Sequence, residues 1–208
     1  MARKPRTGRG SGASQHGRLR IVAGKWRRRL LPVVDAKGLR PTPDRVRETL
    51  FNWLQPVIDG ARCLDLCAGT GALGFEALSR GARSAKFIDN SPRVIKALRE
   101  TAAVLGASDA VIEQADALAW LQRRMDEPFH IVFVDPPYGT DMQAELCRLL
   151  DRYGWLALAA RIYVEQDSRE QDLSLPDGWR VIRQDTAGTV RYCLLAADNL
   201  SPDSRSSP

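Results

Sequence analysis

The sequence predicts an α/β protein with a Rossmann-like, seven-stranded and mostly parallel sheet. From residue 60 onward, apolar segments of strand length alternate with amphipathic segments of helix length, which is typical of a parallel sheet with helices on both faces. A glycine-rich loop, Gly69 to Gly74, follows the first of these strands, as in folds that bind a nucleotide-like cofactor at a helix N-terminus. Only residues 184–188 separate the last two strands, so one of them should run antiparallel.

The individual elements follow from apolar periodicity and turn residues. Strands are expected near residues 62–66, 84–89, 110–114, 130–134, 161–165, 178–183 and 189–195. Helices are expected near residues 71–80, 92–105, 117–126 and 142–152. Before this core, residues 18–34 alternate basic and apolar side chains around Gly24, which predicts a β-hairpin with one cationic face.

A further helix should connect this hairpin to the core. Thr42 is a good N-cap, Pro43 fits the first turn, and Asp44 suits the positive end of the helix dipole. We expect the helix to end before Pro56. Its apolar face is formed by Val46, Leu50, Phe51 and Leu54. Arg45 and Arg47 should leave that face, where they are free to form salt bridges or to reach a ligand.

Charge is distributed unevenly along the chain. Residues 1–40 hold 12 of the 31 Lys and Arg residues and one of the 25 acidic residues, which gives this arm a net charge of +11 and the remainder −5. Such an arm is typical of proteins that bind a polyanion. We predict a basic disordered tail (1–17), a hairpin and helix extension that contacts the polyanion (18–58), the main domain (59–197) and a second disordered tail (198–208).

The composition argues against several classes of protein. No apolar run approaches the roughly 18 residues that span a bilayer, and the basic N-terminus is not followed by the apolar segment of a secretory signal. The four cysteines form no Cys-x-x-Cys pair, and the chain has only two histidines, so we expect no metal site. These thiols should be reduced and structural, in a cytoplasmic protein.

The segment Asp135-Pro136-Pro137-Tyr138 is the most informative motif in the chain. It closes an apolar strand, at the sheet edge where open α/β proteins bind ligands. Two successive prolines fix the backbone and remove two N–H donors. A flat heterocycle with an amino group could stack on Tyr138 and donate to Asp135 and to the Pro136 carbonyl. This motif is typical of methyltransferases that act on planar amino groups.

The glycine loop by itself leaves two cofactors open. Residues 69–74 match the dinucleotide motif G-x-G-x-x-G, and Asp89 lies where a ribose-binding acid would be found. S-Adenosylmethionine is favoured by Asp65, which could meet the methionine ammonium but would repel a pyrophosphate. It is also favoured by Asp116, which could accept from an adenine amino group, although this residue is equally a plausible helix cap.

Residues from about Arg20 to Leu195 resemble the bacterial 16S ribosomal RNA guanine-N2 methyltransferases of the RsmD family. The resemblance rests on residues 21–27, on Leu39-Arg40-Pro41-Thr42-Pro43-Asp44-Arg45-Val46-Arg47-Glu48, on the Asp65 to Gly74 loop and on residues 133–138. It implies a methyltransferase fold, S-adenosylmethionine as methyl donor, and one guanine of 16S rRNA on a 30S subunit or assembly intermediate as substrate. A monomer is the default state for this resemblance. The family often has Phe at the position of Tyr138, and the acid represented by Asp89-Asn90 varies.

Motif and resemblance together predict three groups of site residues. The predicted catalytic residues are Asp135, Pro136, Pro137 and Tyr138. The predicted cofactor-binding residues are Asp65, Leu66, Cys67, Ala68, Gly69, Thr70, Gly71, Asp89, Asn90, Asp116 and Ala117. The predicted RNA-binding residues are Arg18, Arg20, Lys25, Arg27, Arg28, Arg29, Arg40, Arg45 and Arg47.

Four other functions stay open on the residues alone. A DNA adenine-N6 methyltransferase would use the same Asp135 motif, although it normally needs a separate target-recognition region. A protein glutamine methyltransferase would more usually have Asn at this position. An NAD-binding oxidoreductase fits the glycine loop, and a non-catalytic RNA-binding module would explain only the basic arm.

Overall fold

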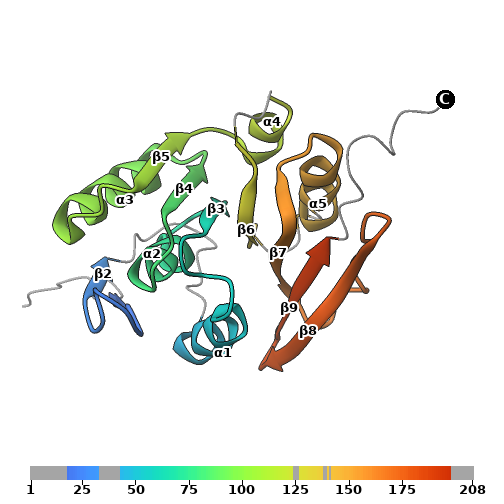
Figure 1. Ribbon diagram of the computed structural model, residues 1–208, viewed down its shortest axis with the longest axis horizontal. Coiled ribbons are helices and arrows are strands. Elements are labelled where there is room, and N and C mark those ends of the chain that lie inside the picture. Colours follow the sequence, from blue (N-terminus) through green and yellow to red (C-terminus); the bar gives the residue numbers. More distant parts are fainter. Residues whose placement is uncertain (1–17, 33–42, 124–126, 138–139, 141, 198–208) are drawn as a thin grey trace, which may run out of the picture.

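The computed structural model describes residues 18–32, 43–123, 127–137, 140 and 142–197. Two sheets and five helices make up this part of the chain (Figure 1). In chain order the elements are β1 (Arg18–Arg20), β2 (Leu30–Pro32), α1 (Asp44–Leu54), β3 (Arg62–Leu66), α2 (Ala72–Ser79), β4 (Ser84–Asp89), α3 (Pro92–Leu105), β5 (Ala110–Gln114), α4 (Ala117–Leu121), β6 (Phe129–Val134), α5 (Met142–Arg152), β7 (Leu156–Asp167), β8 (Trp179–Ala187) and β9 (Val190–Ala197).

The large sheet has seven strands in the order β5-β4-β3-β6-β7-β9-β8. The pairs from β5 to β7 are parallel, whereas β9 is antiparallel to both of its neighbours. This confirms the mostly parallel sheet and the antiparallel strand expected from the short 184–188 connection. Because the order reverses between β3 and β6, the carboxyl ends of these two strands form the switch point at which such sheets bind ligands.

Most element boundaries agree with the sequence prediction, with three differences. Strand β8 extends to Ala187, four residues beyond the expected end, so most of the expected 184–188 connection belongs to the strand. Strand β7 begins at Leu156, five residues earlier than expected, because a bulge shifts the register from Phe129↔Leu156 to Ile131↔Arg161. Ala159 adopts φ 57° within this bulge, which breaks the alternation of side chains on which strand prediction depends. Helix α4 ends at Leu121 rather than at residue 126; residues 124–126 lie outside the described part of the chain.

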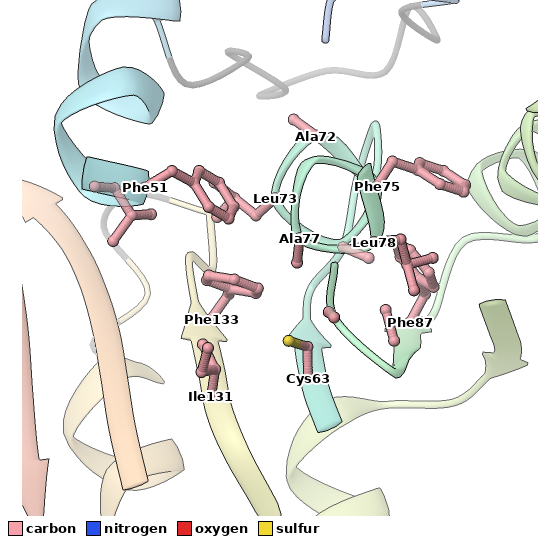
Figure 2. Packing of buried hydrophobic residues seen from close by; sticks show 14 of the residues in the cluster. Phe51, Cys63, Ala72, Leu73, Phe75, Ala77, Leu78, Phe87, Ile131 and Phe133 are labelled. Atoms are coloured by element: carbon pink, nitrogen blue, oxygen red, sulfur yellow. The ribbon is translucent and has the colours of Figure 1, made fainter. Parts of the chain in front are cut away.

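Two apolar cores cover the two faces of the large sheet. Alternate side chains of β3 and β6, such as Cys63 and Phe133, pack with α1, α2 and α3 on one face. Their neighbours Leu64 and Val134 pack with α4 and α5 on the other face. Figure 2 shows the first core, in which side chains of α2 lie over β3 and β6 and the Phe51 ring of α1 faces Phe133, with ring centroids 6.0 Å apart.

The strands β1 and β2 pair antiparallel. Together with the turn between them they pack into the first core through Leu19, Ile21, Trp26 and Leu31. The extension 18–58 and the main domain therefore share one apolar core, and the boundary proposed between them stays a prediction. The predicted tails, residues 1–17 and 198–208, lie outside the described residues.

The start of α1 differs from the prediction. Pro43, not Thr42, is the N-cap residue of this helix, and no side chain caps it. The prediction that Arg47 leaves the apolar face is wrong, because its side chain is fully buried. The hairpin covers this flank of α1, and the Arg47 guanidinium donates to the carbonyl of Arg20 in β1 at 2.7 Å.

Candidate cofactor and substrate site

The glycine loop makes a tight turn at the carboxyl edge of β3. The N–H of Gly71 donates to the carbonyl of Ala68 at 2.7 Å, and the N–H of Ala68 donates to Ile88 of the neighbouring strand. Cys67, Gly69 and Gly71 all have positive φ, at 59°, 53° and 72°. Cys67 is the unusual member, because non-glycine residues seldom adopt this conformation outside functional loops. Helix α2 begins at Ala72 within this loop, so the N–H groups of its first turn lie at this edge of the sheet.

Asp65 lies beneath this loop and supports it. Its side chain is buried, and its Oδ2 accepts a hydrogen bond from the N–H of Gly74 at 2.9 Å. Burial raises the pKa of this carboxyl to about 8; the Gly74 hydrogen bond lowers it, and the negative charge of Asp89 raises it further. The sequence placed Asp65 at the methyl donor's ammonium, and the structure adds this bracing contact to the loop.

Asp89 connects the loop to the next helix. One carboxylate oxygen accepts from the N–H of Gly69 at 3.0 Å, and the other accepts from the N–H of Ser91 at 2.9 Å. The neighbouring Asn90 is exposed, and its carbonyl accepts from the amide of Gln114. The ends of β4 and β5 are thereby linked to the glycine loop at a single edge.

Asp116 serves as the N-cap of α4, which is the structural role that the sequence had left open. Its Oδ1 accepts from the N–H of Ala119 at 2.9 Å, and its side chain is exposed. Ala117, the first residue of the helix, is buried below it. A cap uses one carboxylate oxygen as acceptor, so the role does not conflict with a contact to an adenine amino group.

The four strand-end acids meet around Cys67. Burial raises the pKa of the Cys67 thiol to about 12, and the charges of Asp89, Asp135, Asp65 and Asp116 all contribute to this increase. The thiol is therefore protonated and a poor nucleophile at neutral pH. These acids are separated by up to 70 residues in the sequence, yet they all lie near Cys67, at the switch point between β3 and β6.

The Asp135-Pro136-Pro137 segment follows β6 beside the glycine loop. Leu66 and Val134 are partners in the β3–β6 register, so Cys67 and Asp135 follow them at the ends of adjacent strands. Asp135 is half-buried, Pro136 is buried and Pro137 is exposed. The Thr140 hydroxyl donates to the Pro137 carbonyl at 2.7 Å, which stabilises the chain after the prolines. Tyr138 lies outside the described residues, so its stacking role stays a prediction.

The basic residues of the extension divide into two groups. Lys25, Arg27, Arg28 and Arg29 are exposed on the turn between β1 and β2. Arg20 and Arg45 are also exposed, whereas Arg40 and the side chain of Arg18 lie outside the described residues. Arg47 is removed from the predicted RNA contacts, because it is fully buried and ion-paired to Asp44 at 2.6 Å.

Comparison with known proteins places this arrangement in a family. The model of the family described as Conserved hypothetical protein 95 matches residues 19–196. The Ribosomal RNA small subunit methyltransferase D of Escherichia coli is 47% identical over 87% of this chain and 91% of its own length. The protein of the same name from Haemophilus influenzae is 41% identical over 86% of this chain and 93% of its own length. The chain belongs to this family.

Solved structures agree with this assignment. A structure from Escherichia coli, named provisionally as a methyltransferase, is 43% identical, has a TM-score of 0.82, and matches over 88% of this chain and 100% of that one. An RNA methyltransferase from Salinibacter ruber, solved with S-adenosyl-L-homocysteine, has a TM-score of 0.59 over 79% of this chain and 98% of that one. It is 17% identical, so it supports the methyltransferase fold alone.

In this family member, two buried polar residues of α2 hold the turn of the extension, and the sequence analysis missed both. The Glu76 carboxylate accepts from the N–H groups of Val22 and Ala23 at 2.8 and 3.0 Å. The Ser79 hydroxyl accepts from the N–H of Trp26 and donates to the Ala23 carbonyl. A signal was available, because Glu76 is the one charged residue between Asp65 and Arg80.

Glu165 is a third residue that the motifs did not indicate. Val134 and Val164 are partners in the β6–β7 register, so Glu165, which lies within β7, is level with Asp135 just after the end of β6. Glu165 is buried, and its carboxylate accepts from the Tyr163 hydroxyl at 2.8 Å. The signal was an acid as the last residue of the strand expected over residues 161–165.

Neither a metal site nor a membrane span is found in the described part of the chain. No group of three or more His, Cys, Asp or Glu residues there could hold a metal ion. Among the same residues, no helix is both long enough and apolar enough to cross a membrane. The four thiols are unpaired with one another, and burial raises the pKa of each.

Proposed function

We propose that this chain is an S-adenosylmethionine-dependent methyltransferase that modifies the exocyclic N2 amine of one guanine in 16S rRNA. The observation that carries the proposal is the adjacency of two strand ends. The glycine loop after β3 and the Asp135-Pro136-Pro137 segment after β6 lie side by side at the switch point of the sheet. The names of the relatives at 47% and 41% identity support ribosomal RNA of the small subunit as the substrate class.

The residues present fit this cofactor. The loop offers backbone N–H groups at the start of α2, and Asp89 and Asp116 stand at the ends of β4 and β5, where ribose hydroxyls and an adenine amino group could donate. The buried Asp65 lies beneath the loop, where its carboxyl group could accept a hydrogen bond from the ammonium of the methionine part. When bound, S-adenosylmethionine supplies a methyl group on a positively charged sulfur.

The role of the chain itself is to position the guanine. The N2 lone pair of guanine is delocalised into the ring, so this nitrogen is a poor nucleophile. Hydrogen bonds from its two N–H groups to Asp135 and to the Pro136 carbonyl direct the lone pair at the methyl group. The nitrogen loses one proton after transfer, and we assign Asp135 as its acceptor.

Access to the base has a cost that the RNA contacts must offset. The guanine has to leave its stack, which costs a few kcal/mol. Stacking on Tyr138 would return about 1–3 kcal/mol. The exposed cations of the extension supply affinity that does not depend on sequence. The substrate is a 30S subunit or an assembly intermediate, and the enzyme acts as a monomer in the cytoplasm.

The direct test is transfer of a labelled methyl group. Purified protein and labelled S-adenosylmethionine are incubated with 30S particles from a strain that lacks this modification, and the rRNA is digested to nucleosides. The proposal predicts label in N2-methylguanosine of 16S rRNA. Naked 16S rRNA and duplex DNA serve as parallel substrates. Label in adenine of DNA would support the DNA methyltransferase instead.

A binding experiment tests the cofactor separately. Calorimetric titration with S-adenosylmethionine, S-adenosylhomocysteine and NAD should give binding of the first two only. Binding of NAD alone would identify the glycine loop as a dinucleotide site. It would reduce the Asp135 segment to a proline turn.

A further inference from the structure

The cationic turn of the extension has a fixed conformation. Within residues 21–29, the N–H of Arg28 donates to the Ile21 carbonyl at 2.9 Å, and the N–H of Arg29 donates to the Trp26 carbonyl at 3.0 Å. Trp26 is buried in the core below the turn, and the Lys25 ammonium lies 4.3 Å from the centroid of its ring. The turn is therefore shaped before any partner arrives.

The turn is attached to the cofactor helix by polar contacts that leave little freedom. Besides the Glu76 and Ser79 side-chain contacts, the N–H of Lys25 donates to the Ser79 carbonyl at 2.8 Å. Gly24 has φ 81°, and a Cβ at this position would lie 1.8 Å from the Ser79 carbonyl oxygen. Only glycine permits this approach.

Glu76 is the centre of the attachment. Its side chain is fully buried. Besides the two N–H groups of the turn, the Arg80 Nε–H donates to its carboxylate at 2.7 Å. The Arg47 guanidinium, also fully buried, lies 3.7 Å away. A buried carboxylate needs this many donors to offset its desolvation. An amide in its place would present an NH2 group to one of these donors, so the contact is specific to the charged form.

The same helix carries the cofactor loop at its other end. Helix α2 starts after Gly71 and has eight residues, which at 1.5 Å per residue span roughly 12 Å. Ser79 is its last residue, so the turn is held about one helix length from the loop. Within the part of the chain that the structure describes, Lys25, Arg27, Arg28 and Arg29 form no ion pair with an acidic residue. Their charges are available to phosphates.

We infer that Glu76 is a positioning residue for RNA: it fixes the cationic turn at a set distance from the cofactor loop, so that RNA phosphates bound by the turn hold the RNA over this loop. The inference rests on the proposed function. It assigns Glu76 no contact with RNA or cofactor, and Glu76 acts through Arg27, Arg28 and Arg29. Loss of the carboxylate should therefore weaken use of the RNA substrate and leave cofactor binding in place.

The test compares two ways of releasing the turn. Glu76→Gln acts from the helix, and Gly24→Ala acts from the turn without altering α2, which keeps the test valid if the first variant fails to fold. Both should raise KM for unmodified 30S particles on the order of tenfold, with kcat and calorimetric affinity for S-adenosylmethionine within about twofold. The slope of log K against log salt should decrease by about two if three phosphate contacts are lost. Glu100→Gln, on the exposed face of α3, makes the same chemical change as a control.

A combined variant distinguishes positioning from general damage. In a background of Arg27→Ala, Arg28→Ala and Arg29→Ala, adding Glu76→Gln should raise KM no further, because the groups through which Glu76 acts are gone. An additive increase would overturn the inference. So would an unchanged KM in both Glu76→Gln and Gly24→Ala when the triple arginine variant binds RNA weakly. If the triple variant keeps full RNA affinity, the proposed RNA contact of the turn is itself wrong.

Discussion

The guanidinium of Arg47 and the carboxylate of Glu76 lie 3.7 Å apart, and neither side chain is exposed to solvent. Arg47 comes from α1 and Glu76 from α2, so the pair joins the connecting helix of the extension to the helix of the cofactor loop. Arg47 also donates to the Arg20 carbonyl and to Asp44 at 2.7 and 2.6 Å. A residue that the sequence suggested as an RNA contact is instead a structural tie between three segments.

Neighbouring arginines of α1 should therefore respond differently to substitution. Arg47→Ala leaves the Glu76 charge short of a buried partner, and it should destabilise the fold by about 3–5 kcal/mol. Arg45→Ala removes an exposed cation and should change stability by less than about 0.5 kcal/mol. Urea unfolding of both variants measures this difference. Equal stability losses would show that burial of Arg47 does not govern its role.

Gly71 and Gly106 form a matched pair for testing the cofactor loop. Their φ angles are 72° and 63°, so alanine strains the backbone similarly at both, by roughly 1–2 kcal/mol. A Cβ at Gly71 would lie 2.6 Å from Leu98 and 2.7 Å from Phe75, whereas Gly106 faces open space. Gly71→Ala should abolish S-adenosylmethionine binding in calorimetry, and Gly106→Ala should retain it. Parallel losses would attribute the effect to backbone strain alone.

Asp135 can be separated from the cofactor site by kinetics. Asp135→Asn keeps the size of the side chain but removes its charge. The amide accepts a weaker hydrogen bond from the guanine N2 amine and cannot accept its proton. We expect kcat to fall on the order of 100- to 1000-fold, with donor affinity unchanged. Single-turnover methyl transfer and calorimetry measure the two quantities. A fall in donor affinity of the same size would assign Asp135 to cofactor binding.

Sequence patterns predicted the elements that depend on local periodicity. The bounds of β3, β4 and β5 agree with the prediction because each is an apolar run closed by polar or turn residues. The acids Asp65, Asp89 and Asp135 were found because they directly follow or close such runs. The early start of β7 was missed, because the bulge around Ala159 arises from pairing with β6 and not from the local pattern.

Contacts between segments far apart in the chain could not be predicted from the sequence. The burial of Arg47 depends on the hairpin packing against α1, and the sequence of α1 alone does not show that the hairpin lies there. Glu76 was missed because its burial depends on the extension, which helps to bury all eight residues of α2. A helix covered on several sides loses its polar face, so a lone charge in it indicates a specific partner.

Asp89 should contribute to donor binding through the loop as well as directly. Its carboxylate accepts from the N–H groups of Gly69 and Ser91 at 3.0 and 2.9 Å. Asp89→Ala removes both charge-assisted bonds, and the loss of one such bond is worth about 1.5–3 kcal/mol. S-Adenosylmethionine affinity should decrease at least tenfold, while the exposed Asp109→Ala should have no effect. An unaffected Asp89→Ala variant would exclude the carboxylate from the site.

The buried Asp65 predicts a pH-dependent stability of the ligand-free protein. An Asp in an unfolded chain ionises near pH 4, whereas burial raises the pKa of Asp65 to about 8. Between these values the folded state binds more protons than the unfolded state, so this group makes stability fall as pH rises and has no further effect above pH 8.

Asp65→Asn removes the titration and can still accept from the Gly74 N–H. The free energy of unfolding of the variant, relative to that of the parent protein, should therefore increase between pH 4 and pH 8, by at most about 1.4 kcal/mol per pH unit. Urea unfolding across this range measures the gain. A difference that stays constant with pH would mean that Asp65 ionises normally in the fold.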